Sequence, residues 1–115
     1  MQRYLHLRRA EDFQRLRREG MTQPHRLMVL SYAHNELMHN RYGFIVSKQL
    51  GKAVTRNRIR RRLREIMRAL DPQLKPGYDI VLIARHPLAE QPFDAMLRTV
   101  SDLTRRARLL KEDVS

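Results

Sequence analysis

The strongest constraint on the fold of this chain is a run of seven arginines between Arg56 and Arg68, inside a segment of helical pattern from Gly51 to Leu70. At about 100° per residue, five apolar side chains of this segment fall on one stripe, namely Ile59, Leu63, Ile66, Met67 and Leu70. The opposite face carries Asn57, Arg61, Arg64 and Arg68. A helix of this kind packs its stripe on a core and turns its guanidinium groups outward, where they suit the phosphates of a nucleic acid. The pattern therefore predicts an amphipathic helix that faces nucleic acid.

The composition agrees with such a partner and limits the size of the fold. Twenty-four lysines and arginines against twelve acidic residues leave a net charge of +12 in 115 residues, with a pI near 11.3. A field of this strength attracts polyanions from a distance. The length suits one domain, which we expect to span residues 1–115, and the 42% of hydrophobic residues suffice for one core.

Missing residue types and segments exclude several classes of protein. The chain has no cysteine, so it forms neither disulfides nor thiolate metal sites. Residues 1–9 lack the apolar run of a secretory signal, and no segment approaches the roughly 18 apolar residues of a membrane span. We therefore expect a soluble, cytoplasmic protein without a membrane partner.

Local patterns place the elements of the N-terminal half. Apolar spacing and the stop signal Gly20 predict a short helix over residues 10–19. Two apolar, partly β-branched runs, 27–32 and 42–46, are joined by a polar connection and predict an antiparallel hairpin. The arginine-rich helix follows and ends near Pro72, since proline cannot continue it.

The C-terminal half adds a strand and a helix. In the strand predicted over 78–84, the run from Ile80 to Ala84 is apolar without alternation, which is typical of a central strand buried on both faces. Pro92 suits the first position of a last helix. The core stripe predicted for that helix consists of Phe93, Met96, Leu97, Val100, Leu103, Ala107 and Leu110. The expected fold is a single small α+β domain of order α-β-β-α-β-α, with its sheet covered by helices.

The residues do not predict an independent catalytic site. Of the twelve acidic residues only Asp79 borders a predicted strand, so the convergent carboxylates of a metal nuclease are missing. The histidines, which lack the spacing of metal ligands, are His6, His25, His34, His39 and His86. The serines at 31, 47 and 101 have no neighbouring base, and Gly51-Lys52 lacks the other residues of a phosphate-binding P-loop. We expect no catalytic residue and no metal ligand in the protein.

Several kinds of nucleic-acid binder remain open on these patterns. One is a ribosomal or chaperone-like RNA-binding protein without a catalytic context. Another is a DNA-binding protein that places the arginine-rich helix in a major groove. Helix-turn-helix proteins need two consecutive helices joined by a short turn, whereas predicted strands flank this helix on both sides. The element order therefore favours RNA.

One continuous stretch carries a family signature. From Phe44 to Arg64 the sequence reads Phe-Ile-Val-Ser-Lys-Gln-Leu-Gly-Lys-Ala-Val-Thr-Arg-Asn-Arg-Ile-Arg-Arg-Arg-Leu-Arg, which joins a strand, a glycine turn and an Arg-Asn-Arg triplet. This stretch strongly resembles the family of bacterial ribonuclease P protein subunits. The sequence Glu-Asp-Phe at 11–13 is similar to the family's first helix and residues 79–85 to its late strand, so the resemblance spans almost the whole chain.

The resemblance implies a subunit of a ribonucleoprotein that removes 5′ leaders from precursor tRNA by endonucleolytic cleavage. It implies that the large RNA supplies catalysis and holds most of the Mg²⁺, and that the protein alone binds no cofactor and is inactive. The implied partners are the catalytic RNA and precursor tRNA, with no obligate protein partner. The family also implies a left-handed βαβ crossover through the arginine-rich helix, whereas about 98% of such connections are right-handed.

The resemblance assigns RNA contacts to two groups of residues. Those expected to contact the catalytic RNA are Lys52, Arg58, Arg61, Arg62, Arg64 and Arg68. Those expected in a cleft for the single-stranded leader are Phe13, Arg17, Tyr32, Lys48, Arg56, Asn57 and Arg60. Arg17 departs from the family, which commonly has a second aromatic at this position, but a guanidinium plane also stacks on bases.

Several of these residues have a structural alternative. Phe13 lies on a helix stripe and could simply pack in the core, and Asn57 could cap the start of the arginine-rich helix. The lysines at 48 and 52 are either solvated or bound to phosphate. The facing of Tyr32 is open, because a shift of one residue in strand register sends a side chain to the other face.

Overall fold

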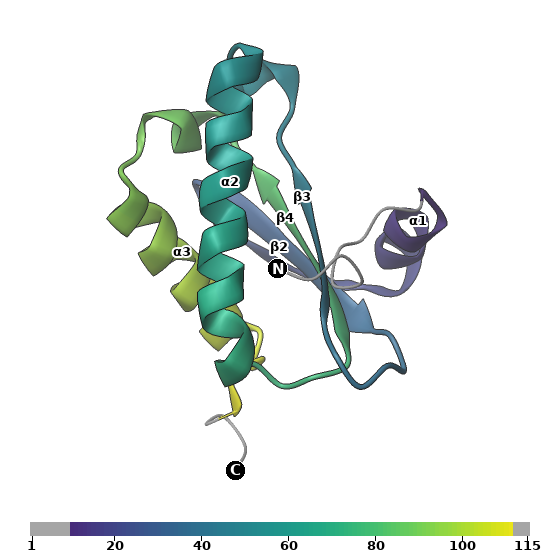
Figure 1. The fold of residues 1–115 in the computed structure, drawn as a ribbon. Coiled ribbons are helices and arrows are strands. Elements are labelled where there is room, and N and C mark those ends of the chain that lie inside the picture. The colour runs from purple at the N-terminus through teal and green to yellow at the C-terminus, as the bar shows by residue number, and fades with distance from the viewer. Residues whose placement is uncertain (1–9, 112–115) are drawn as a thin grey trace.

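The computed structural model describes residues 10–111, in which four strands form one sheet with helices on both faces (Figure 1). The elements in chain order are α1 (Ala10–Glu19), β1 (Met21–Pro24), β2 (Met28–His34), β3 (Arg41–Ile45), α2 (Ala53–Leu70), β4 (Tyr78–Ala84) and α3 (Phe93–Arg106). Short 3₁₀ helices follow β3, α2 and β4, at Lys48–Leu50, Asp71–Gln73 and His86–Glu90. The predicted α+β class is confirmed, with one strand more than the predicted order contains. Among these elements, no helix has both the length and the apolar character needed to cross a bilayer.

The strand order in the sheet is β1-β2-β4-β3, with β4 in the predicted central position. β4 pairs antiparallel with β2 and parallel with β3. The predicted hairpin of 27–32 with 42–46 is therefore wrong, because β4 lies between these two strands. The most continuously apolar strand occupies the centre, where both of its faces and both of its backbone edges are covered. Covering this apolar strand on all sides therefore decides the strand order, rather than pairing between strands that are neighbours in the sequence.

The strand missing from the prediction is β1, a four-residue strand at one edge of the sheet. It pairs antiparallel with β2, from Met21 opposite Tyr32 to Pro24 opposite Val29. Three of its four residues are exposed, and its last residue is a proline, which is tolerated on an edge strand. Backbone hydrogen bonds to β2 hold it in place, so no apolar alternation marks it in the sequence.

The connection from β3 through α2 to β4 has the left-handed sense that the family resemblance implies. In Figure 1 the chain ascends β3, descends α2 in front of the sheet, and ascends β4 to the left of β3. A right-handed connection viewed in this way would place the second strand on the right. The expectation from the resemblance is confirmed, against the general preference for the opposite hand.

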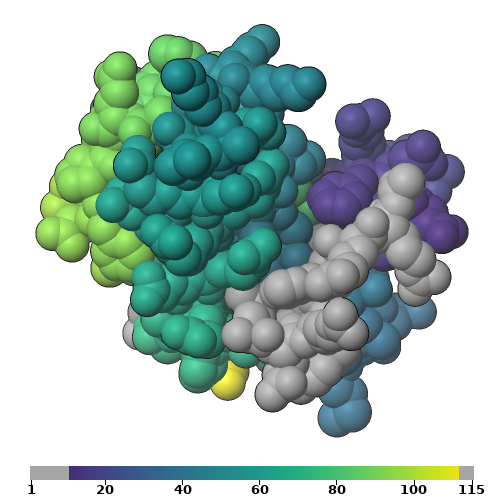
Figure 2. Space-filling view, turned by 45° about the horizontal axis from the view of Figure 1, so that its top comes forward, coloured from purple at the N-terminus to yellow at the C-terminus, as the bar shows by residue number. Residues whose placement is uncertain are grey.

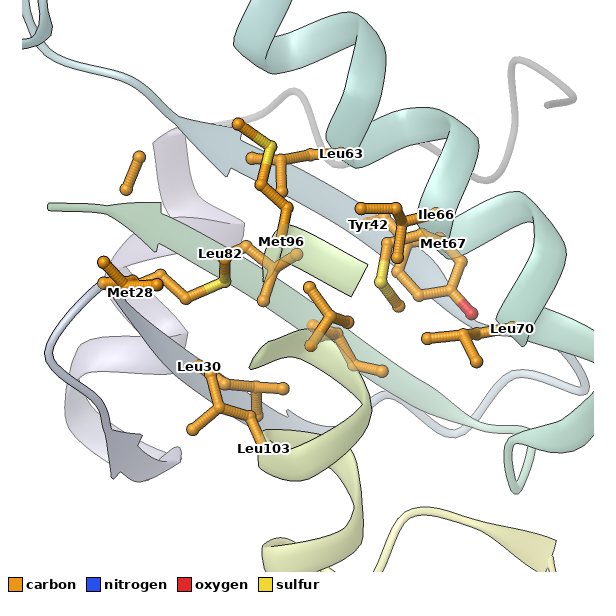
Figure 3. Packing of buried hydrophobic residues seen from close by; sticks show 14 of the residues in the cluster. Met28, Leu30, Tyr42, Leu63, Ile66, Met67, Leu70, Leu82, Met96 and Leu103 are labelled. Carbon is orange, nitrogen blue, oxygen red and sulfur yellow. The ribbon is translucent and has the colours of Figure 1, made fainter. Parts of the chain in front are cut away.

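The main core fills the space between the sheet and the two helices α2 and α3 (Figure 3). All five residues of the predicted α2 stripe, from Ile59 to Leu70, are buried. The strands contribute alternate residues to this core, including Met28 and Leu30 of β2 and Leu82 of β4, since successive strand side chains point to opposite faces. The apolar stripe of α2 is thus fixed on the sheet, and its arginines lie on the outer side.

A second, smaller cluster lies on the other face of the sheet, beneath α1. Leu16 packs there on Ala33 of β2 and Val81 of β4, with Phe13 and Ile83 beside them. This face has far fewer buried apolar side chains than the face covered by α2 and α3. The attachment of α1 therefore depends strongly on polar interactions.

The helix ends follow the sequence signals, except at the two ends of α3. The Gly20 N–H donates to the Leu16 carbonyl at 2.9 Å, and a Cβ at Gly20 would lie 2.4 Å from that oxygen, so the position requires glycine. Pro92 caps α3 instead of occupying its first helical position. Leu110, predicted on the α3 stripe, is buried but lies beyond the helix in a bridge with Leu74.

Candidate RNA interface

The outer face of α2, which Figure 2 shows turned to solvent, carries a dense group of arginines. Arg58, Arg61, Arg64 and Arg68 are exposed. Arg62, on the flank of the helix, is half-buried. Three of these arginines and Glu65 line a shallow hollow of about 200 Å³ on this face. The structure therefore brings five of the six residues expected to contact the catalytic RNA onto one helix.

The charges on this face are not neutralised within the described part of the chain. The ion pairs found among residues 10–111 join arginines of α1, β3 and α3 to acidic residues, and none involves an arginine of α2. The acidic neighbour in the hollow, Glu65, makes no ion pair among them. Guanidinium groups in this state are available for bidentate contacts with phosphate.

The first turns of α2 are tied to the end of β3. Arg60 donates from Nη1 to Asn57 Oδ1 at 3.1 Å and from Nη2 to the Val46 carbonyl at 3.3 Å. Arg56 Nε donates to the Gly51 carbonyl at 3.2 Å. These bonds join Arg60 to Asn57 and to the residue that follows β3, and they hold Arg56 on the turn before α2.

The alternative role of Asn57 as a helix cap is wrong. Lys52 is the N-cap of α2, without a side-chain capping bond, and the side chain of Asn57 instead accepts from Arg60. The turn before α2 depends on Gly51, whose φ of 133° lies in a region that side chains rarely adopt. A Cβ there would also lie 3.2 Å from Thr55 Cβ. The glycine of the Arg-Asn-Arg stretch therefore sets the direction in which α2 leaves the sheet.

A groove of about 440 Å³ lies between α1 and the sheet. Its lining residues are Phe13, Gln14, Leu16, Arg17, Ser31, Ile45, Val81 and Ile83. In Figure 2, α1 stands apart from α2, and the surface between them is hollowed. The floor is apolar, and Ile45 at its β3 end keeps 39% of its surface exposed. An open apolar floor beside arginines suits unpaired bases with their phosphates.

Phe13 and Arg17 both line this groove from α1. Phe13 is half-buried, because it packs beside Leu16 in the small cluster and also faces the groove. Core packing and groove lining are thus compatible for this ring. Arg17, one helical turn later, is exposed and lies where the family commonly has an aromatic.

A buried carboxylate anchors α1 and β3 to the central strand. Asp79 of β4 is fully buried, and its carboxylate accepts two hydrogen bonds of 2.8 Å from Arg41. Arg15 of α1 also donates to Asp79, and Asn35 donates to it at 3.0 Å. Arg41 reaches Asp12 of α1 as well, at 3.4 Å. The hydrogen bond to Asp79 is the main cause that raises the pKa of Arg41, so this cation stays charged.

Sequence reasoning missed the partners of Asp79. An acidic residue in an otherwise apolar central strand is a signal in itself, because a buried charge requires an opposite charge nearby. The sequence contains so many arginines that it does not identify which of them pairs with Asp79. Arg15 turns to Asp79 while Arg17, two residues on, lines the groove, a difference that depends on the rotation of α1 over the sheet.

Tyr32 lies apart from the other residues predicted for the leader cleft. Its neighbour Ser31 lines the groove, and alternation along β2 sends Tyr32 to the opposite face of the sheet. There it packs against the main core, with its ring 6.1 Å from that of Tyr78.

Lys48 and Lys52 are both exposed in the connection between β3 and α2. In residues 10–111, no group of three or more histidine, aspartate or glutamate side chains is placed to hold a metal ion.

Comparison with known proteins identifies the family. A family model described as Ribonuclease P matches residues 1–108. The chain belongs to the ribonuclease P protein family. The ribonuclease P protein component of Roseiflexus castenholzii is 47% identical, over 100% of this chain and 95% of the relative. That of Caldanaerobacter subterraneus is 38% identical, over 92% and 91% respectively.

Solved structures of ribonuclease P proteins have the same fold. That of Staphylococcus aureus matches with a TM-score of 0.87 at 30% identity, over 93% of this chain and 98% of its own. That of Thermotoga maritima matches with a TM-score of 0.79 at 30% identity, over 87% and 96%. The resemblance drawn from the Arg-Asn-Arg stretch is confirmed. As a ribonuclease P protein component, the chain is part of an RNA-containing ribonuclease complex of tRNA processing.

Proposed function

We propose that this ribonuclease P protein binds the catalytic RNA through α2 and the 5′ leader of precursor tRNA through the groove beside α1. The observation that carries the proposal is that two separate RNA-compatible surfaces meet at the end of β3. Ile45 lines the groove, and the next residue, Val46, accepts a hydrogen bond from Arg60 of α2. A single-stranded RNA segment in the groove would therefore lie close to α2, the helix that faces the catalytic RNA.

The two surfaces suit different RNA structures. The exposed arginines of α2 form an array of charge around a hollow lined by charged side chains, which fits the phosphate backbone of a folded RNA. The groove combines Phe13, an apolar floor and Arg17, which fits unpaired bases that stack while their phosphates are held. A leader is single-stranded, so the groove distinguishes precursor tRNA from mature tRNA.

We assign the chemistry of cleavage, and most of the Mg²⁺, to the RNA. The carboxylate nearest to the groove floor in the central strand, Asp79, is already engaged by Arg15 and Arg41. A metal-dependent nuclease site needs carboxylates that remain free to bind cations. In this proposal the protein contributes by binding and orienting the leader, and so promotes its endonucleolytic removal.

The RNA that copurifies with the protein from its native host tests this function. We expect one abundant structured RNA of several hundred nucleotides, and complexes that bind precursor tRNA more tightly than mature tRNA. Recovery of ribosomal RNA in its place, with equal affinity for both tRNA forms, would support a general RNA-binding role instead. A variant with Arg61 and Arg64 replaced by alanine is the matched control, because it should lose the copurifying RNA while keeping its fold.

A further inference from the structure

A second cavity, of about 530 Å³, lies at the edge of the sheet where β1 begins. Its lining residues are Arg15, Glu19, Met21, Tyr32, Ala33, His34, Lys75, Tyr78, Ala107 and Arg108. β1 pairs with β2 only as far as Tyr32, so among residues 10–111 no strand covers the edge of β2 at Ala33 and His34. The cavity, which we call the edge pocket, is therefore bounded by the ends of α1, β2 and α3. Its volume is in the range of pockets that bind small organic groups.

Three rings form one continuous aromatic wall in the edge pocket. His34 and Tyr78 are opposite each other in the β2–β4 pairing, with ring centroids 4.4 Å apart and planes tilted by 32°. Tyr32 meets Tyr78 edge-on at 6.1 Å. Both tyrosines pack against the main core, which fixes them, whereas His34 is exposed. The ring of His34 packs on the fixed ring of Tyr78, and its exposed side is open to a further ring.

Cations surround this wall. Lys75 Nζ donates to the Arg108 carbonyl at 2.9 Å, which holds the ammonium group at the rim of the pocket. Arg108 follows α3 with a φ of 58° and is exposed. Arg15 donates to the His34 carbonyl at 2.9 Å, but its charge is paired with Asp79, so the positive charge of the pocket comes from Lys75 and Arg108. Among the lining residues that the structure describes, the one acid is Glu19, and it lies 3.8 Å from Arg15. The pocket is therefore net cationic around an aromatic surface.

Aromatic rings with surrounding cations are the combination that binds unpaired nucleotides, because the base stacks and the phosphate is neutralised. We propose that the edge pocket holds an unpaired nucleotide of the precursor tRNA leader, farther from the tRNA body than the part in the groove. This inference rests on the proposed function of the groove.

The position of α1 connects the two cavities. Gln14 and Arg17 face the groove, whereas Arg15 and Glu19 of the same helix line the edge pocket. Because residues of α1 line both cavities, a single-stranded RNA that leaves the groove along α1 runs toward the edge pocket. The structure thus assigns the pocket to the same strand rather than to a second RNA.

A series of precursor tRNAs with leaders of increasing length tests the proposal. Affinity for the complete ribonucleoprotein should rise in two steps, first when the leader fills the groove and again when it reaches the edge pocket. The double variant His34→Ala/Arg108→Asn should remove the second step, a loss of roughly fivefold or more in affinity for long leaders. Asparagine tolerates the positive φ at position 108, so the substitution removes the charge without straining the turn.

The matched control is His86→Ala/Arg98→Gln, which removes an exposed imidazole and an exposed guanidinium that do not line the edge pocket. It should keep both steps. If the double pocket variant unfolds, the single variant His34→Ala tests the same stacking surface. An unchanged second step in the pocket variant, or a single step in the wild type, would overturn the inference. Equal affinity for mature and precursor tRNA at every leader length would overturn the proposed function instead, so the two failures are distinct.

Discussion

Arg41 holds Asp79 through two parallel hydrogen bonds, from Nε to Oδ1 and from Nη2 to Oδ2, each 2.8 Å long. The first residue belongs to the edge strand β3 and the second to the central strand β4. Because Arg15 of α1 shares the same carboxylate, one buried charge fixes the strand and the helix that border the groove. The geometry of the groove therefore depends on ion pairs that join α1 to the two strands.

Replacing Asp79 by alanine should reduce the free energy of unfolding by about 3 to 5 kcal/mol, because two partly buried guanidiniums lose their counter-charge. Chemical denaturation measures this. The matched control is Asp102→Ala, which breaks an exposed ion pair of similar length, 2.8 Å, with Arg106. That change should cost no more than about 1 kcal/mol. Equal costs for the two variants would contradict a structural role of Asp79.

The arginines of α2 give a second prediction. Replacing Arg61, Arg64 and Arg68 by alanine should weaken binding to the catalytic RNA and flatten its salt dependence, by close to one unit of log–log slope for each phosphate that is no longer neutralised. The control variant replaces Arg85, Arg98 and Arg105, which are exposed elsewhere and carry the same total charge. A salt slope that flattened equally in both variants would show that net charge, rather than the α2 face, determines binding.

The triple α2 variant should remain folded, because its three side chains are exposed. Leu63→Ala on the same helix provides the contrast. Leu63 is fully buried, so its truncation should cost about 2–5 kcal/mol of stability through a cavity in the core.

The sequence predicted those parts of the molecule that depend on local pattern. The burial of Leu63 and its neighbours on α2 follows from helical periodicity, and the end of α1 follows from Gly20. The order of strands did not follow, because β2 and β3 are neighbours in sequence but are separated by β4 in the sheet. β1 has no apolar pattern to reveal it. Pairing between distant segments is a property of the folded sheet, which one sequence expresses only weakly.

In the candidate site, too, features that depend on local pattern were predicted and contacts between distant segments were not. Helical spacing predicted the arginine face of α2, whereas the place of Phe13 in the groove was implied by the family resemblance. The facing of Tyr32 required the register of β2, in which Ser31 takes the groove position. The joint binding of Asp79 by Arg15 and Arg41 connects residues up to 64 positions apart. No local pattern encodes such a contact.

A third prediction concerns catalysis. Purified protein with Mg²⁺ should leave precursor tRNA uncut, and addition of the partner RNA should restore cleavage at the 5′ end of the mature sequence. The reason is that the described residues bring together no set of carboxylates able to hold a cation. Gel analysis of labelled precursor measures the outcome. Specific cleavage by RNA-free protein would assign the chemistry to the protein.

The buried hydroxyl of Tyr42 gives a prediction of pH dependence. Tyr42 donates to Asp71 at the end of α2 and accepts from Asn40 at 3.3 Å. Burial, together with the bond to Asp71, raises the pKa of Tyr42 well above its ordinary value of 10.0. The unfolded chain therefore loses this proton first as the pH rises, so the stabilisation is complete below about pH 10 and declines above it.

Tyr42→Phe should cost about 1–2 kcal/mol near neutral pH, because Asp71 and Asn40 lose a partner. The difference in unfolding free energy between wild type and variant should shrink as the pH rises above about 10. Comparing the two proteins at each pH cancels the titration of the lysines and the other tyrosines. A difference that stayed constant up to about pH 11 would contradict the protonated, hydrogen-bonded state of Tyr42.

The last prediction tests the groove. Phe13→Ala should weaken binding of precursor tRNA to the complete ribonucleoprotein by about 1–3 kcal/mol, the usual value of one base–aromatic contact. Mature tRNA has no leader, so its affinity should change little. Arg17→Ala should show the same selectivity with a larger dependence on salt, because a guanidinium also holds a phosphate.

Phe93→Ala is the control for the loss of a ring, since Phe93 packs against the main core on the face of the sheet opposite to α1. It should lower stability without changing the ratio of precursor to mature affinity. Each variant is first checked for folding, and the two tRNA forms are then titrated side by side. Because Phe13 also packs beside Leu16, a loss of stability alone is expected to lower both affinities together. An equal loss of affinity for precursor and mature tRNA would therefore contradict leader binding in this groove, whereas a loss for precursor tRNA alone would support it.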